Sequence, residues 1–281
     1  MEFNRNINRP VIAVLGAGAM GIAITRRIAN NKTILLGDNS EETLNKRAEE
    51  LRTSGYTVET MQVDALKKES VASFAKMAAS LGDVMYYIHT AGASPNQATP
   101  EHIVALDLVA TAVAIDEFGK VISNGGAGLV ISSQTGYMMP FTSEQEALMA
   151  MTPTDELANL DMIKNDFTAN PGIAYIASKR CNHLRVRTAA ATTWAARHAR
   201  INTISPGIIV TPLAYDEFAA AGEGYQKMID ASSARRVGTI DEIAYAGAFL
   251  LSDQASFITG TDILVDGGVI AAMMAGTYHL G

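Results

Sequence analysis

The amino-terminal half of the chain alternates short apolar runs with segments of helical character, and this alternation limits the possible folds more than any other feature. The first run, Val11–Leu15, contains no polar residue and ends at a glycine, as expected of a parallel strand buried on both faces of a sheet. Helical character follows from Gly21 to Asn30, and further strands are predicted at 33–37, 58–63, 84–88 and 127–132. Strands separated by helices predict an α/β fold with a doubly wound parallel sheet and helices on both faces.

The composition favours a single domain over residues 1–281, because no linker, repeat or low-complexity tract divides the chain. The charged fraction of 18% lies below the ~25% typical of soluble domains, which favours burial of surface in an oligomer. The formal net charge of −7 offers no attraction for nucleic acid, and no apolar run approaches the length of a membrane span. The five histidines lack the paired spacing of metal ligands, so no metal site is expected. The single Cys181 and the lack of an apolar leader favour a reducing, cytoplasmic location.

A glycine-rich turn follows the first strand, with the sequence Gly16-Ala17-Gly18-Ala19-Met20-Gly21. Where such a turn joins a strand to a helix, the helix N-terminus presents free N–H groups and a partial positive charge to a pyrophosphate. The alternative is a tight turn that binds no ligand. The strand before it and the helix after it favour a dinucleotide site, and hence a Rossmann fold.

Asp38 ends the second predicted strand, about twenty residues after the glycine turn. An acidic side chain at this point accepts both ribose hydroxyl protons of NAD and repels the additional phosphate of NADP. The alternative role is a helix cap, since Asp38, Asn39 and Ser40 are all favourable N-caps and Glu41 stands at the spacing of a capping box. Because neither the glycine turn nor position 39 contributes a cation, the sequence predicts NAD rather than NADP.

Tyr175 and Lys179 are spaced by one helical turn, which places them on one face of a helix. A free phenol has a pKa of about 10, and a neighbouring ammonium stabilises the phenolate and lowers that pKa. A phenol adjusted in this way suits general acid–base catalysis between an alcohol and a ketone. Such a pair often arises by chance, so its meaning depends on its position after the glycine turn and after Ser133.

This ordered set resembles the short-chain dehydrogenase/reductase family, and the resemblance extends over residues 11–269. It implies that Ser133 orients and polarises the substrate carbonyl beside Tyr175, and that Lys179 also holds the nicotinamide ribose. Asp107, in a helical segment at 101–123, stands where the family usually has a catalytic Asn. The backbone carbonyl of that Asn helps to hold a proton-relay water, and a backbone role of this kind is compatible with Asp107.

The resemblance also implies the remaining cofactor contacts. Besides the glycine turn and Asp38, these are Asp64, Ala65, Ala91, Gly92, Tyr175, Lys179, Pro206, Gly207, Ile209 and Thr211. Two stretches depart from the family pattern. The turn reads G-x-G-x-x-G instead of G-x-x-x-G-x-G, and His89-Thr90 replaces the common Asn-Asn.

An insertion at 137–170 separates Ser133 from Tyr175, which lie much closer together in the family. Two short helices are predicted within it, one beginning at Ser143 with Glu146 at capping-box spacing and one beginning at Thr154. The insertion is rich in flexible or aromatic apolar side chains: Met138, Met139, Phe141, Met149 and Met151. Such side chains suit a substrate lid around a bulky apolar molecule. The alternative is additional packing or an oligomer interface.

The predicted function is therefore NAD-dependent interconversion of a secondary alcohol and a ketone on a bulky apolar substrate, such as a hydroxysteroid or bile acid. A small-ketone or 3-oxoacyl reductase is the alternative among enzymes. A catalytically silent dinucleotide-binding sensor is the alternative from another class, although a sensor has no need of Ser133, Tyr175 and Lys179 together. The low charged fraction and the family resemblance predict a homotetramer.

Overall fold

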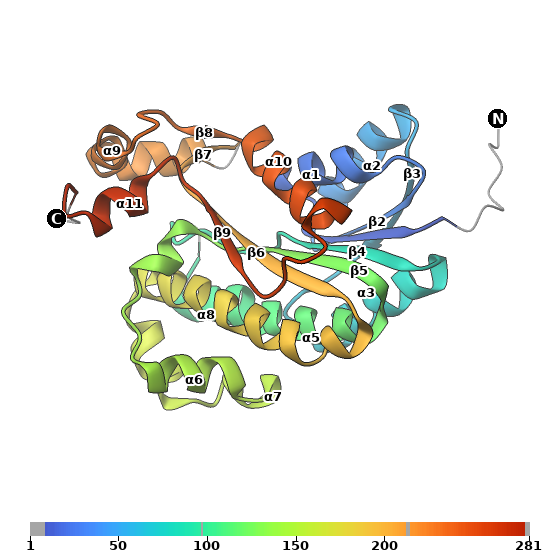
Figure 1. Ribbon diagram of the computed structural model, residues 1–281, viewed down its shortest axis with the longest axis horizontal. Helices are drawn as coiled ribbons and strands as arrows, with labels where there is room; N and C mark the ends of the chain where they lie inside the picture. Colours follow the sequence, from blue (N-terminus) through green and yellow to red (C-terminus); the bar gives the residue numbers. More distant parts are fainter. Residues whose placement is uncertain (1–8, 97, 212–213, 279–281) are drawn as a thin grey trace.

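The computed structural model describes residues 9–96, 98–211 and 214–278. A seven-stranded parallel sheet crosses the molecule in the order β3-β2-β1-β4-β5-β6-β9 (Figure 1). Its strands are β1 (Val11–Leu15), β2 (Thr33–Asp38), β3 (Thr57–Gln62), β4 (Val84–His89), β5 (Ile122–Ile131), β6 (Arg200–Pro206) and β9 (Asp262–Val265). The short strands β7 (Ile209–Val210) and β8 (Gly238–Thr239) form a separate parallel pair.

The strand order changes direction between β1 and β4, which are neighbours in the sheet. Leu15, the last residue of β1, pairs with Gly37 of β2 and with His89 of β4. In doubly wound sheets, ligands bind at the carboxyl ends of the strands beside such a switch point. The predicted α/β Rossmann fold is confirmed.

In the described part of the chain, three long helices cover each face of the sheet (Figure 1). One face carries α1 (Ala19–Ile28), α2 (Glu41–Thr53) and α10 (Ile240–Leu251). The other carries α3 (Lys68–Leu81), α5 (Thr111–Val121) and α8 (Pro171–Ala191). β1 shows why both faces are covered, because Val11 and Ala13 pack into the core below α3 and α5 while Ile12 and Val14 pack into the core below α1 and α10.

The remaining elements outside the insertion do not form part of these two helical layers. They are α4 (Pro100–Ile103), the π-helix η1 (Val104–Ala110), the 3₁₀ helices η2 (Gln134–Met138), η5 (Ala195–Arg197) and η6 (Asp253–Ala255), and the helices α9 (Ala214–Ala231) and α11 (Val269–Met274). The predicted helix over 101–123 is thus divided, because a π-turn separates α4 from α5. Among the described residues, no helix has both the length and the apolar character needed to cross a membrane.

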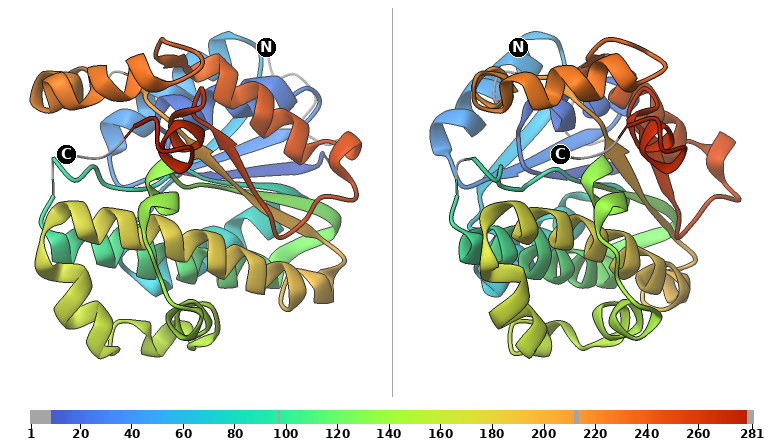
Figure 2. Two further views of the ribbon diagram at one scale, coloured as in Figure 1. Left: turned by 60° about the vertical axis from the view of Figure 1, so that its left-hand side comes forward. Right: turned by 90° about the vertical axis from the view of Figure 1, so that its left-hand side faces the viewer.

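The insertion lies on the far side of α8 from the sheet (Figure 2). It consists of α6 (Ser143–Met151), α7 (Thr154–Leu157), the π-helix η3 (Met162–Asp166) and the 3₁₀ helix η4 (Phe167–Ala169). Met149, Leu157 and Phe167 are buried with residues of α8, α4 and η1 in a third hydrophobic core. The insertion therefore covers the outer side of the helix that carries Tyr175 and Lys179.

The first helix of the insertion begins one residue earlier than its predicted capping box. The Thr142 side chain accepts a hydrogen bond from Gln145 N, and the Gln145 side chain accepts one from Thr142 N. Glu146, predicted to complete the box, instead forms an ion pair with Arg180 of α8. The Glu146 side chain, which the sequence pattern assigned to the helix cap, is thus used in a tertiary contact with α8.

Candidate active site

The glycine turn after β1 is packed tightly against the turn after β4. Gly16 has φ +98°, and a Cβ atom at this position would lie 2.4 Å from Ala91 N. A Cβ atom at Gly21 would lie 2.8 Å from Thr90 Oγ1, and the Thr90 hydroxyl itself donates to Gly16 O at 2.7 Å. Thr90 therefore fastens the two turns together, a role that the sequence did not indicate.

Gly18 differs from these two glycines because a Cβ atom there would meet no other atom within 4 Å. It is the N-cap of α1, and no side chain of the residues that the structure describes caps this helix. An open helix N-terminus without a capping side chain suits a pyrophosphate, whose oxygens would accept hydrogen bonds from the first backbone N–H groups. The residues present therefore fit a dinucleotide.

Asp38 lies at the mouth of this turn. Its Oδ2 accepts a hydrogen bond from Ala17 N at 2.8 Å, and its Oδ1 accepts one from Ser40 N at 3.0 Å. The N-cap of α2 is Ser40, which accepts from Thr43 N, so Asp38 is not the helix cap. Within the described residues, no Lys or Arg forms an ion pair with Asp38.

Asp64 and Ala65 lie just after β3, the strand that pairs with β2. Val63 N donates to Asp38 O at 2.8 Å, so the ends of these two strands lie side by side. The Asp64 carboxylate accepts from Leu66 N at 3.1 Å and contacts Lys67 Nζ at 2.9 Å. The hydrogen bond from Lys67 holds the pKa of Asp64 below its ordinary value. The predicted adenine contact at this place stays a prediction.

Tyr175 and Lys179 lie one turn apart near the start of α8. Asn170 caps this helix by accepting a hydrogen bond from Ile173 N at 2.9 Å. The Lys179 Nζ atom lies 5.1 Å from the centroid of the Tyr175 ring. Tyr175 is half-buried, whereas Lys179 is almost fully buried. The cation therefore lies where it favours the phenolate form of Tyr175.

Lys179 has a second charged neighbour in Asp107. The Lys179 Nζ and Asp107 Oδ2 atoms are 3.0 Å apart, and the Asp107 side chain is completely buried. Burial alone would lower the pKa of Lys179, but the charges of Asp107 and Tyr175 and the hydrogen bond to Asp107 together raise it. The structure thus gives the Asp107 side chain a direct contact with Lys179, whereas the sequence suggested only a backbone role.

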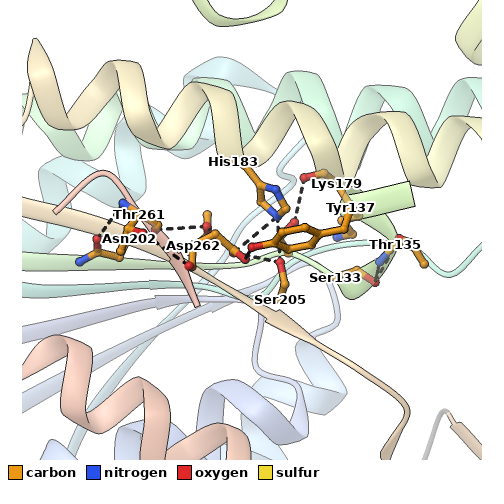
Figure 3. A network of polar contacts seen from close by, with 11 residues as sticks. Ser133, Thr135, Tyr137, Lys179, His183, Asn202, Ser205, Thr261 and Asp262 are labelled. Atoms are coloured by element: carbon orange, nitrogen blue, oxygen red, sulfur yellow. Dashed lines mark hydrogen bonds and ion pairs between the residues drawn. The ribbon is translucent and has the colours of Figure 1, made fainter. Parts of the chain in front are cut away.

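Ser133 follows β5 and caps η2. Its hydroxyl oxygen accepts hydrogen bonds from Thr135 N at 3.2 Å and Thr135 Oγ1 at 3.1 Å (Figure 3). The neighbouring Ser132 is directed to another partner, because its hydroxyl donates to Lys179 O at 2.9 Å. This bond joins the end of β5 to α8, so Ser132 has a structural role beside Ser133.

The segment after β6 lies at the same end of the sheet as the turns after β1 and β4, where the carboxyl ends of the parallel strands meet. Gly207 is in close contact with the chain after β9, since a Cβ atom there would lie 2.6 Å from Asp266 Cα. Pro206 ends β6, and the buried side chain of Ile209 packs against Gly238 of β8. Four of the predicted cofactor contacts lie at the carboxyl ends of β4 and β6, namely Ala91, Gly92, Pro206 and Gly207. Their contacts with a cofactor stay predictions, as does that of Thr211.

A buried polar network anchors η2 to the sheet and to α8, and the sequence analysis missed it (Figure 3). Asp262 accepts hydrogen bonds from Tyr137 OH at 2.7 Å and Ser205 Oγ at 2.9 Å, and His183 Nε2 lies 2.8 Å from Ser205 Oγ. Burial lowers the pKa of His183 to about 4 despite the opposing charge of Asp262. A histidine on the buried face of α8 and an aspartate at the start of an edge strand were the available signals.

The chain is similar to known oxidoreductases over nearly all its length. A family model described as enoyl-(acyl carrier protein) reductase matches residues 130–270. The short-chain dehydrogenase/reductase bsc3 of Alternaria brassicicola is 38% identical over 274 residues, which cover 96% of this chain and 99% of that protein. The 7α-hydroxysteroid dehydrogenase of Bacteroides fragilis is 26% identical, with 95% of this chain and 96% of that protein covered. A solved short-chain dehydrogenase/reductase of Serratia marcescens has a TM-score of 0.72 at 21% identity, with 92% of this chain and 97% of that chain covered.

The fold and the arrangement of the site are those of a dinucleotide-dependent oxidoreductase. More narrowly, the chain belongs to the short-chain dehydrogenase/reductase family. This fold binds a nicotinamide dinucleotide, NAD or NADP, and its relatives are named as dehydrogenases and reductases.

Proposed function

We propose that this protein interconverts a secondary alcohol and a ketone with NAD as its cofactor. The observation that carries this proposal is the Tyr175 phenol with the Lys179 ammonium 5.1 Å from its ring, on the first turns of α8. A phenol beside a buried cation can both accept and donate a proton near neutral pH. Ser133 stands at the end of β5, on the strand edge where the glycine turn would hold the dinucleotide.

In the oxidation direction, Tyr175 accepts the hydroxyl proton of the alcohol while the carbinol hydrogen leaves as a hydride. When bound, the nicotinamide supplies the acceptor for that hydride. Ser133 would orient the reacting oxygen by hydrogen bonding, and Lys179 would stabilise the phenolate before the reaction and hold the nicotinamide ribose. In reduction, Tyr175 returns the proton to the developing alkoxide.

The preference for NAD follows from Asp38. Its carboxylate is held beside the glycine turn by Ala17 N and Ser40 N, and no cation pairs with it among the described residues. A 2′-phosphate at this place would face an uncompensated negative charge, whereas the ribose hydroxyls of NAD can donate to it.

A bulky apolar substrate is favoured by the first part of the insertion. Met139 and Phe141 pack around the same hydrophobic core as Tyr175, and the Phe141 ring stacks on Phe167 at 5.7 Å. We assign the substrate wall to residues 138–141, with α6 and α7 holding that wall and α8 in place. The similarity to a 7α-hydroxysteroid dehydrogenase supports a hydroxysteroid or bile acid. The matched enoyl-(acyl carrier protein) reductase model favours an acyl substrate as the second candidate.

The test is an absorbance assay of NADH formation or consumption with hydroxysteroids, bile acids, small alcohols and 3-oxoacyl thioesters. We expect the highest kcat/KM with NAD and a steroid-sized alcohol. The highest value with a small ketone or a 3-oxoacyl thioester would contradict the substrate proposal. Tight cofactor binding without turnover of any substrate would instead favour a dinucleotide sensor.

A further inference from the structure

A carboxylate and an ammonium are buried together beside Tyr175. Asp107 has no exposed surface, and its Oδ2 lies 3.0 Å from Lys179 Nζ. Its Oδ1 accepts a hydrogen bond from Ala93 N at 2.7 Å. Within the described residues, Oδ2 has no donor apart from that ammonium. The Asp107 carboxylate therefore lies against the Lys179 ammonium and opposes part of the positive charge that a lone lysine would present to Tyr175.

The π-turn η1 carries Asp107 to this position. A π-turn adds a residue to the helical turn and changes the direction of the side chains, and such turns are frequent at functional sites. Thr111, just after η1, supports the widened turn by donating to Leu106 O at 3.4 Å. Gly92 lies beside the pair, because a Cβ atom there would be in van der Waals contact at 3.4 Å with both Asp107 carboxylate oxygens and with Lys179 Nζ.

No other carboxylate among the described residues forms an ion pair with Lys179. Apart from Asp107 and Tyr175, the titratable groups that interact with the Lys179 charge are His89 of β4 and His183 of α8, and His183 in turn lies beside Asp262 of β9. Burial lowers the pKa of His89 to about 3 and that of His183 to about 4, so both rings are neutral at neutral pH. Arg180 is paired with the insertion, and Asp262 is bound by hydroxyl groups. The charge nearest to the Lys179 ammonium is therefore that of Asp107.

We propose that Asp107 is a positioning residue that fixes the Lys179 ammonium and offsets part of its charge, so that Tyr175 ionises at a higher pH than it would beside an unpaired lysine. A cation favours the phenolate, and an anion bound to the same cation opposes that effect. Oxidation of an alcohol needs the phenolate, so its rate should rise at a correspondingly higher pH. This inference rests on the proposed acid–base function of Tyr175.

The direct test is the titration of Tyr175 in the cofactor-free protein. NMR of protein with carbon-13-labelled tyrosine rings follows each phenol with pH, and the signal lost in Tyr175→Phe identifies Tyr175. Asp107→Asn keeps the shape of the side chain and removes its charge, so the ionisation midpoint should fall by about one pH unit. The matched control is Asp83→Asn, which removes an exposed carboxylate at the opposite end of β4 and should leave the midpoint unchanged. An unchanged or raised midpoint in folded Asp107→Asn overturns the proposal.

The pH profile of kcat/KM for alcohol oxidation gives a second readout. Its acid limb should move down by about one pH unit in Asp107→Asn. A purely structural role would lower kcat at every pH and leave the limb in place, which also overturns the proposal. If Asp107→Asn does not fold, Asp107→Ser takes its place with the same expected shifts. A wild-type protein without turnover contradicts the proposed function, whereas the NMR midpoint still decides the role of Asp107.

Discussion

At the scale of single residues, the site depends on how charges are arranged around one phenol and one carboxylate. Lys179 contacts both Tyr175 and Asp107. Its ammonium lies 5.1 Å from the Tyr175 ring centroid and 3.0 Å from Asp107 Oδ2. The sequence predicts the Tyr175–Lys179 pair because the i, i+4 spacing is a local property of one helix. It cannot predict the contact with Asp107, because that contact joins two helices and depends on a π-turn with no known sequence pattern.

The charge of Asp38 should decide the choice of cofactor. We expect kcat/KM for NAD to exceed that for NADP by at least roughly tenfold, because a 2′-phosphate would lie against the carboxylate. Asp38→Asn should reduce this ratio, mainly by improving the use of NADP. Glu59→Gln removes an equal charge from an exposed position on the neighbouring strand β3 and should leave the ratio unchanged. Equal use of the two cofactors by the wild-type protein would contradict the assignment.

At the scale of helices and strands, the insertion supports the catalytic helix from outside. Arg185 of α8 donates to Thr152 O at 2.5 Å and to Thr154 Oγ1 at 2.6 Å. The predicted helices of the insertion are present, but the second is broken into α7, η3 and η4. Hydrophobic periodicity predicts a helix from its apolar spacing, whereas the breaks follow from packing against α8, which the sequence pattern does not contain.

Arg185→Met tests this support. The substitution keeps the apolar stem and leaves buried carbonyl groups without a donor, so the free energy of unfolding should fall by about 2 kcal/mol. For a chain of this size, that loss corresponds to a decrease in Tm of roughly 4 °C. Arg187→Met, on the exposed side of the same helix, is the matched control and should change Tm little. Equal effects of the two substitutions would show that the insertion contributes little to the stability of α8.

The substrate wall is tested by replacing Met138 and Met139 with serine. Loss of apolar surface at ~25 cal/mol per Å² should raise KM for a steroid-sized alcohol by about tenfold. KM for a small alcohol and the affinity for NADH should change much less. Met151→Ser, at the exposed end of α6, is the matched control. A uniform increase in KM for both alcohols would mean that this segment has only a structural role.

At the scale of the whole molecule, one edge of the sheet carries exposed apolar surface. β9 is the outermost strand, and the neighbouring α10 and its following loop expose Tyr245, Phe249 and Phe257, the last of them fully. An outermost strand near exposed aromatic side chains suits contact with another subunit. The sequence predicts a parallel sheet because helices separate the strands, but it does not identify the partner of an edge strand.

We expect a homotetramer in light scattering at micromolar concentration. Phe257→Asp should lower the measured mass, because it places a charge on the exposed edge. Leu148→Asp, on the exposed side of α6, should leave the mass unchanged if the insertion is not an interface. Dissociation by Leu148→Asp alone would place the interface on the insertion, and a monomeric wild-type protein would contradict the assembly altogether.

The turnover of Tyr175→Phe decides whether Tyr175 transfers the proton in an alcohol–ketone interconversion. General acid–base catalysis contributes about 10²–10⁴-fold, so kcat should fall by at least about a hundredfold. The dissociation constant of NADH should stay nearly unchanged, because the phenylalanine ring still packs in the same place. Tyr245→Phe, which removes an exposed phenol on α10, should retain full activity. A Tyr175→Phe protein that keeps more than about a tenth of wild-type turnover would contradict the account.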